Sequence, residues 1–370
     1  MQPTLKQRFE TFKEKLFADI TSVPEILQPS YFPGLDGLRA ISIIMVLLGH
    51  SLIGTWWADH FQGNIGVDIF FVISGFLITT LLLKEKVKNG KISLSKFYIR
   101  RFLRIFPVAY LYLSCLTILN YIFDLHTTLR MFLTAGLYIG NFPVKYGRNW
   151  QTAHFWSLAV EEQFYLLFPF ILIKSINRYL SIIILILILL PFIVIAGEFS
   201  LQHYGNHIIT KILLFFTYLL GYGTSSILIG SLTSILIFKR IITFRDSTPC
   251  LLSFLIFIIA IVLHINGVLN WNFIIYVFPF LVSYVIVLNL NNNNFFSLIL
   301  NHRMVVYMGI LSYSVYIWQQ LFTYNQPWKN LFKYSDSLLL NYISLFLIAY
   351  FSYNFFERKF LNLKKYFKVI

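Results

Sequence analysis

The sequence has few charged residues and almost no cysteine. Charged residues make up 12% of the 370 residues, whereas a soluble domain carries roughly 25%. Hydrophobic residues make up 58%, and the mean hydropathy is +0.71. This composition argues against a soluble globule, a disordered chain and a nucleic-acid-binding domain. Cys115 and Cys250 both lie in apolar runs, so we expect neither a disulfide nor a cysteine metal site.

Acidic residues are also scarce. The chain has 15 Asp and Glu residues against 30 Lys and Arg residues, which gives a net charge of +15. The basic residues stand between long apolar runs rather than on one polar face. We therefore interpret them as topology signals and as contacts to anionic lipid head groups. Membrane lipids are an expected partner, and nucleic acid is not.

Long apolar runs dominate the sequence. Since a transmembrane helix needs about 20 mostly apolar residues, the sequence predicts an all-α integral membrane protein. Ten segments are candidate spans: 38–57, 64–83, 103–123, 155–173, 180–197, 212–238, 249–264, 271–290, 305–325 and 337–356. The apolar stretch 131–142 is too short to span comfortably, and we expect a re-entrant or half-buried helix there.

The distribution of basic residues favours ten spans with both termini in the cytoplasm. In that topology 24 of the 30 Lys and Arg residues are cytoplasmic, as the positive-inside rule requires. We expect a multi-pass protein of the cytoplasmic (inner) membrane. Residues 1–30 form an amphipathic N-terminal segment, with a floppy charged tail as the alternative. Residues 31–360 form the membrane domain, and 361–370 form a basic cytoplasmic tail.

Ionisable residues inside membrane spans are costly, so each is a functional candidate. These residues are Arg39, His50, Asp68, Glu161 and Glu162. Arg39 and His50 are eleven residues apart, which places them on one helical face and ~16 Å apart along the axis. The predicted topology brings His50, Asp68 and Glu161 to similar depth near the outer surface.

A histidine near a carboxylate can act as a general base on a hydroxyl. His50 and Glu161 are the candidates for this pair. A polar cluster that only packs helices and a proton relay in a transporter would need the same residue types. The remaining histidines near the predicted outer side have no metal-ligand spacing, and we interpret them as surface residues: His60, His126, His154, His203 and His207.

The predicted cytoplasmic loop 84–104 is rich in basic residues, with eight Lys and Arg. Their role in orienting the protein in the membrane and in binding lipid head groups would explain these basic residues. Arg101 and Arg104 are three residues apart and would share a helix face. Because Arg binds phosphate oxygens through two parallel hydrogen bonds, these residues also suit a phosphate-bearing donor such as an acyl coenzyme A.

Five motifs in order resemble the acyltransferase-3 family of membrane-bound acyltransferases, and the resemblance runs from about Tyr31 to about Phe360. The motifs are GLDGLRAISIIMVLLGH (34–50), GVDIFFVISGFLIT (66–79), FYIRRFLRIFP (97–107), WSLAVEEQFYLLFP (156–169) and the late pair GILSYSVYIW (309–318) and FFERKF (355–360). The first motif matches the family's pattern of an arginine and a histidine separated by ten residues, and the second matches its second helix. The third matches two arginines separated by two residues, the fourth matches Ser-Leu-x-Val-Glu, and the late pair matches the closing motifs. The fourth motif selects Glu161 over Glu162.

The sequence departs from the family pattern at three places. Ile65 stands before Gly66, where the family often has a second glycine. Trp318 is followed by Gln319 in place of a histidine, which weakens a catalytic role for the late motif and leaves His50 unaffected. Many relatives carry an extracytoplasmic hydrolase-like domain, whereas we expect a stand-alone form here.

The resemblance implies transfer of an acyl group, usually acetyl, from cytoplasmic acyl coenzyme A to a hydroxyl of an exported or lipid-linked glycan of the cell envelope. It implies that His50 and Glu161 are catalytic and that Arg39, Arg101 and Arg104 bind the donor. Asp68 and Ser157 would support the site. We expect acyl coenzyme A, most often acetyl coenzyme A, as co-substrate, with no bound cofactor or metal. A glycan or proton-coupled transporter and a membrane scaffold or sensor are the alternatives.

Overall fold

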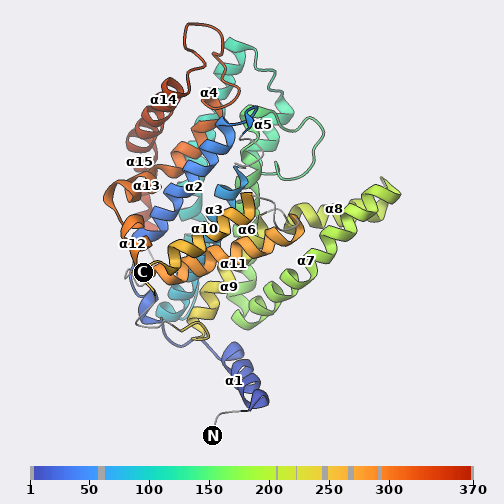
Figure 1. The fold of residues 1–370 in the computed structure, drawn as a ribbon, viewed down its shortest axis with the longest axis vertical. Coiled ribbons are helices and arrows are strands. Elements are labelled where there is room, and N and C mark those ends of the chain that lie inside the picture. Colours follow the sequence, from blue (N-terminus) through green and yellow to red (C-terminus); the bar gives the residue numbers. More distant parts are fainter. Residues whose placement is uncertain are drawn as a thin grey trace.

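The computed structural model describes residues 4–56, 63–205, 207–221, 223–243, 249–265, 271–290 and 294–367, and of these the backbone alone for 265 and 271–275. The described residues form helices and turns, with no strand among them (Figure 1). The helices are α1 (Leu5–Phe17), α2 (Pro33–Ser51), α3 (Asn64–Asn89), α4 (Leu94–Phe123), α5 (Leu129–Gly136), α6 (Phe155–Lys174), α7 (Ile176–Tyr204), α8 (Ile208–Phe216), α9 (Thr224–Phe238), α10 (Leu252–Ile265), α11 (Trp271–Asn289), α12 (Phe295–Leu300), α13 (Arg303–Trp318), α14 (Leu338–Phe351) and α15 (Arg358–Leu363).

Six described helical stretches are long and apolar enough to cross a membrane, or seven if α8 and α9 form one bent span. This confirms an all-helical membrane architecture. Helices α10 and α13, of 14 and 16 residues, are shorter than the roughly 20 residues that a straight span needs. The count of ten spans and the cytoplasmic termini therefore stay predictions. Within 131–142 the chain forms the eight-residue helix α5, which ends at Gly136.

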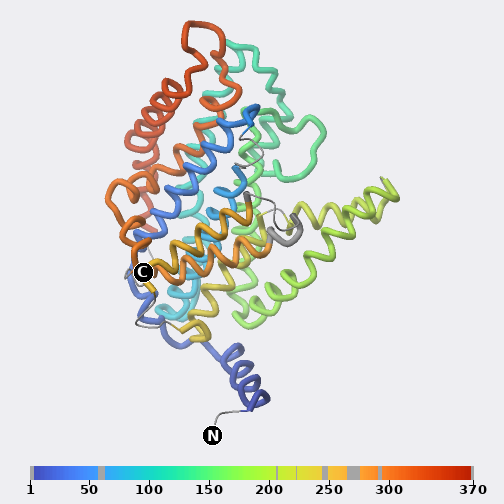
Figure 2. The backbone as a smooth tube through the Cα atoms, in the orientation of Figure 1, coloured from blue at the N-terminus to red at the C-terminus, as the bar shows by residue number. Residues whose placement is uncertain are grey.

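The predicted span 212–238 is not one straight helix. Helix α8 passes into a π-helical turn at Thr217–Gly221, and α9 begins beyond it at an angle of 46°. Gly223 has a φ of +83°, a left-handed conformation that no α-helix continues through. The bend turns α9 toward the middle of the bundle (Figure 2).

The predicted basic loop 84–104 is also wrong in its boundaries. Helix α3 continues to Asn89 and α4 begins at Leu94, so only residues 90–93 connect them. Gly90 has a φ of +69° and ends α3 with the left-handed residue typical of helix C-termini. Arg101 and Arg104 consequently lie on the regular helix α4, which fixes the direction of both side chains.

The centre of the bundle is formed by α2, α3, α9 and α13, whose backbones approach closely. A Cβ on Gly75 of α3 would overlap the carbonyl oxygen of Ile227, and one on Gly230 of α9 would overlap that of Val72. Hydroxyl pairs join the same two helices, among them Thr79–Ser231 at 2.7 Å. Small residues and interhelical hydroxyl bonds are the usual means of association inside a membrane.

The outer helices are more exposed than this centre. Helices α7 and α8 extend from the bundle as an arm (Figure 1), and α7 exposes Leu185, Ile188 and Phe192 along its length. In a membrane such a surface faces lipid. Helix α1 also projects from the bundle and buries none of its residues; its position on a membrane surface stays a prediction.

Gly75→Ala should destabilise the bundle by about 1–3 kcal/mol, since the new methyl group meets backbone that has no room to relax. The expected result is a lower midpoint of thermal denaturation for the detergent-solubilised protein. Gly136→Ala is the matched control, because its Cβ would make only ordinary contacts, with Leu113 at 3.7 Å and Tyr110 at 3.8 Å. Equal midpoints for the two variants would contradict the close approach of α3 and α9.

Candidate active site

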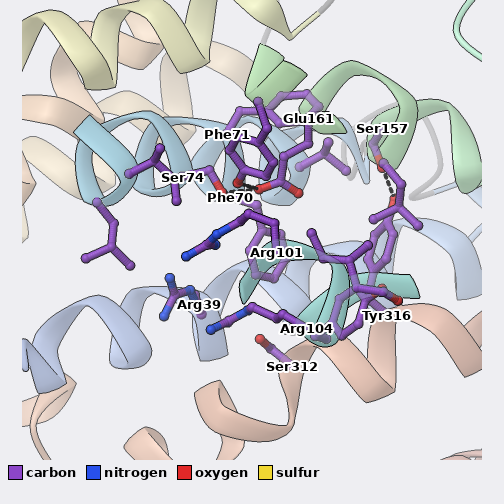
Figure 3. Close-up of a pocket in the computed structure, with 17 residues that line it drawn as sticks. Arg39, Phe70, Phe71, Ser74, Arg101, Arg104, Ser157, Glu161, Ser312 and Tyr316 are labelled. Carbon is purple, nitrogen blue, oxygen red and sulfur yellow. Dashed lines mark hydrogen bonds between the residues drawn. The ribbon is translucent and has the colours of Figure 1, made fainter. Parts of the chain in front are cut away.

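A cavity within the bundle collects most of the predicted site residues. Part of this cavity is open to the outside. Its walls come from α2, α3, α4, α6 and α13 (Figure 3). Its polar lining consists of Arg39, Ser74, Arg101, Arg104, Ser157, Glu161, Tyr165, Ser312, Tyr313 and Tyr316. We call this space the arginine cavity.

Three guanidinium groups point into one end of the arginine cavity (Figure 3). Arg39 of α2 pairs with Asp36, one helical turn earlier. Arg101 and Arg104 of α4 form no ion pair with a carboxylate in the described part of the chain. Because unpaired buried cations are costly, this end of the cavity is suited to an anionic ligand.

Glu161 is the single carboxylate in the lining of this cavity among the described residues. It accepts hydrogen bonds from the hydroxyl groups of Ser74 and Tyr165. The ring of Tyr165 in turn lies 5.7 Å from the Arg101 guanidinium carbon, in cation–π contact. Glu161 therefore belongs to the wall that holds Arg101, and with Asp36 beside Arg39 it offsets only part of the charge of the three cations.

A second cavity adjoins the first at the arginines. Arg39, Leu77, Arg104 and Tyr313 line both spaces. The second one is lined further by the segment around Tyr31 that leads into α2, by α13 and by the C-terminal helical segment, and it includes the carboxylates of Asp36 and Glu357. Together the two cavities form a path from the start of α2 to the three guanidinium groups.

Tyr31 stands on this path, just before α2 begins. Its hydroxyl donates to Asp36 at 2.7 Å, the same carboxylate that pairs with Arg39. Burial, followed by the hydrogen bond to Asp36, raises the pKa of Tyr31 well above its ordinary value. The phenol thus stays protonated and keeps Asp36 in place beside Arg39.

Ser157 and Tyr316 form the other end of the arginine cavity (Figure 3). Their hydroxyl oxygens are 2.5 Å apart. The backbone carbonyl oxygen of His154 lies 3.0 Å from the Ser157 hydroxyl and 3.2 Å from the Tyr316 hydroxyl. Because each hydroxyl carries one proton, one of them donates to this carbonyl and the other donates to its partner hydroxyl. This bonded pair closes the cavity toward the turn that precedes α6.

His50 does not line the arginine cavity. Its Nδ1 lies 2.8 Å from Oε1 of Gln319, and its ring lies edge-on to Trp150 with centroids 5.4 Å apart. Its Nε2 faces Gly63, where a Cβ would come to 3.5 Å. His50 thus occupies a separate site near the far end of α2, where its contacts among the described residues are with uncharged groups.

The structure does not bring the predicted pair together. Among the described residues His50 is hydrogen-bonded to Gln319, whereas Glu161 is bonded to Ser74 and Tyr165. The sequence predicts that His50 and Glu161 lie at similar depth in the membrane, but depth does not determine the direction in which each side chain points. The catalytic roles of His50 and Glu161 stay predictions.

Asp68 lies apart from both sites. Its carboxylate accepts a hydrogen bond from Ser226 of α9 at 2.9 Å, and Asp68 is absent from the lining of the arginine cavity. The contact ties α3 to α9. This geometry favours the packing role that the sequence left open for Asp68.

The interpretation of His154 as a surface residue is wrong. Its side chain is 2% exposed, and its ring lies against Tyr112 and Phe155 at 5.1 and 4.7 Å. Neither ring nitrogen has a hydrogen-bond partner in the described part of the chain. No periodic pattern indicates this burial, because His154 precedes α6 by one residue.

Sequence reasoning also missed the neighbours of His50. Gln319 counts in the sequence only as a departure that weakens the late motif, and no pattern there pairs Trp150 with the imidazole. Both contact the imidazole.

The described residues contain no group of three His, Cys, Asp or Glu side chains that could hold a metal ion.

Comparison with known proteins agrees with this architecture. The model of the family described as an acyltransferase domain matches residues 32–355. O-acetyltransferase OatA of Staphylococcus aureus (strain NCTC 8325 / PS 47) is 32% identical over 326 residues, which cover 81% of this chain and 52% of that protein. Putative O-acetyltransferase SACOL0978 of S. aureus (strain COL) is 30% identical over 319 residues, 78% of this chain and 50% of that protein.

The chain thus spans about half the length of the curated relatives it matches. No solved structure matches it. The family match covers the helices that form the arginine cavity and also His50. The resemblance seen in the motifs is confirmed: the chain belongs to the acyltransferase-3 family of multi-pass membrane proteins.

Proposed function

We propose that this protein is a membrane-bound O-acyltransferase. It moves an acyl group, in the first instance acetyl, from cytoplasmic acyl coenzyme A to a hydroxyl of an exported or lipid-linked glycan. The observation that carries the proposal is the arginine cavity, with two guanidinium groups that no carboxylate of the described residues pairs with. The names of the relatives, both O-acetyltransferases, support the reaction class.

The donor enters through the second cavity, past Tyr31, and its phosphates bind at Arg39, Arg101 and Arg104. Guanidinium groups in a low-dielectric site bind phosphate oxygens strongly. Arg39 and His50 are ~16 Å apart along α2, a distance comparable to the extended thiol arm of coenzyme A. A donor anchored at the arginines would therefore extend its thioester toward His50 once the Ser157–Tyr316 hydroxyl pair, which closes this end of the cavity, separates.

The chemical step uses His50 as general base. Its imidazole takes the proton of the acceptor hydroxyl while the oxygen attacks the thioester carbonyl carbon. The carbon–sulfur bond then breaks, and the imidazolium returns the proton to the departing thiolate. The products are an O-acyl ester and free coenzyme A, so no oxidant or further reactant is needed.

Glu161 acts at the donor end in this scheme. Its bonds to Ser74 and Tyr165 hold the aromatic ring against Arg101. Ser157 acts at the opposite end, where its bond to Tyr316 separates the cavity from His154. The acceptor approaches His50 from the side of Gly63, the predicted outer side of the membrane.

His50→Ala should lower kcat by about 10²–10⁴-fold, the usual contribution of a general base. The measurement is release of free coenzyme A from acetyl coenzyme A by nanodisc protein supplied with a crude glycan fraction, with the ester detected by mass spectrometry. Size-exclusion chromatography checks that the variant is folded. Normal turnover by this variant would exclude His50 as base. Absence of release by wild-type protein with every glycan fraction would favour a transporter.

Arg104→Ala should weaken binding of coenzyme A about 10- to 100-fold, the equivalent of one charge-assisted hydrogen bond. Isothermal titration of nanodisc protein with coenzyme A measures this directly and needs no acceptor. Arg303→Ala is the matched control, because Arg303 is exposed at the start of α13 and lines neither cavity. Equal affinities for the two variants would contradict a donor site at the arginines.

The acceptor can be identified in the source cell. Proton NMR and mass spectrometry of surface glycans should show an O-acyl signal that is lost on deletion of the gene. Wild-type protein should restore the signal, and His50→Ala should not. Restoration of the signal by His50→Ala would refute the mechanism even if the reaction class is right.

A further inference from the structure

We propose that Gln319 is the positioning residue of His50: its amide oxygen fixes the imidazole tautomer in which Nδ1 carries the proton and Nε2 is free to act as the base. This inference rests on the proposed function for its consequence in catalysis. The tautomer itself can be tested without any substrate.

The first step of the argument is the direction of the Gln319 amide. Its Nε2 donates a hydrogen bond to Oε1 of Gln320 at 2.6 Å. Since a side-chain amide has one donor end and one acceptor end, this bond turns Oε1 of Gln319 toward His50. The 2.8 Å contact is then an N–H···O bond in which Nδ1 of His50 donates.

The second step is the rigidity of this arrangement. Gln319 and Gln320 are 0% and 1% exposed and belong to the 3₁₀ turn Gln319–Leu321 that follows α13. The backbone carbonyl of Gln320 accepts a hydrogen bond from the Trp150 indole at 2.9 Å, and the same indole ring lies edge-on to His50. The amide and the imidazole are therefore held from two elements far apart in sequence.

The third step is the free side of the imidazole. A Cβ built on Gly63 would stand 3.5 Å from Nε2, so this nitrogen faces a residue without a side chain. The same Cβ would stand 3.6 Å from Cδ2, so Gly63 lies beside this edge of the ring, where Nε2 carries the lone pair once the proton is fixed on Nδ1. An acceptor hydroxyl placed there could give its proton directly to Nε2, within the reach that general-base catalysis requires.

The hydrogen-bond partner of His50 Nδ1 is the neutral amide of Gln319. A carboxylate in its place would also stabilise the imidazolium. The described residues found beside the ring, Gln319, Trp150 and Gly63, are uncharged. Among the described residues the titratable group that interacts electrostatically with His50 is His154. Gln319 thus orients the base without supplying charge, and the structure predicts that adding a charge at this position changes the pH dependence of the reaction.

Two variants separate these effects. Gln319→Met keeps the length of the side chain but cannot accept the hydrogen bond, and kcat should fall about 10- to 100-fold with little change in KM for acetyl coenzyme A. Gln319→Glu keeps an acceptor at Nδ1 and adds negative charge, so it should retain most of the activity while the acidic limb of the rate profile moves to higher pH. Wild-type kcat in Gln319→Met, or equal loss and equal pH profiles in both variants, would overturn the proposal.

Gln163→Met is the matched control. Gln163 is also a partly buried glutamine, and its amide bonds Asn141 and the backbone of Tyr138 instead of His50. Its substitution should affect stability and leave the pH profile unchanged. A similar shift of the profile in this control would assign the effect of Gln319 to packing and overturn the proposal.

Nitrogen-15 NMR of histidine-labelled nanodisc protein reads the tautomer directly. At about pH 8, above the ordinary titration range of imidazole, wild-type His50 should show a protonated Nδ1 and an unprotonated Nε2. The His50→Ala spectrum identifies the signals, and Gln319→Met should lose the single tautomer. The opposite tautomer in wild-type protein would refute the role of Gln319. The expected tautomer in a protein that transfers no acyl group would instead refute the proposed function.

Discussion

The close approach of helix backbones at the centre of the bundle is the constraint on which the rest of the structure depends. Glycines allow it: a Cβ on Gly66 would overlap backbone of α2, and one on Gly309 of α13 would overlap Asp36. Helix α2 is thereby held between α3 and α13 along its length. Since α2 carries both Arg39 and His50, the same packing fixes the donor end and the proposed catalytic end of the site.

The two ends differ in their electrostatics. Around the arginine cavity, cations exceed carboxylates, and Arg101 and Arg104 have no carboxylate partner among the described residues. Among the described residues, the contacts around His50 are an amide and an indole. A charged donor head group would be attracted to the first site, while these uncharged neighbours suit a base that is neutral before it accepts a proton.

The sequence predicted more of the fold than of the contacts. Apolar runs and basic residues predicted an all-helical membrane protein, and the spacing of Arg101 and Arg104 placed them on one face of what became α4. The bend at Gly223 was missed, because hydropathy is the same across a straight and a broken helix. The burial of His154 was missed since a single histidine before a helix has no periodicity to interpret.

By itself, the sequence determined the fold class, the family and the residue types able to bind an anionic donor and to act as a base. Hydropathy and charge are properties of single helices, so they can be read along the chain. Only the tertiary structure decided which groups meet. It placed Glu161 with Ser74 and Tyr165, and it placed His50 with Gln319, a residue 269 positions away. The direction of a side chain depends on the rotation of its helix against its neighbours, and backbone packing at glycines sets that rotation.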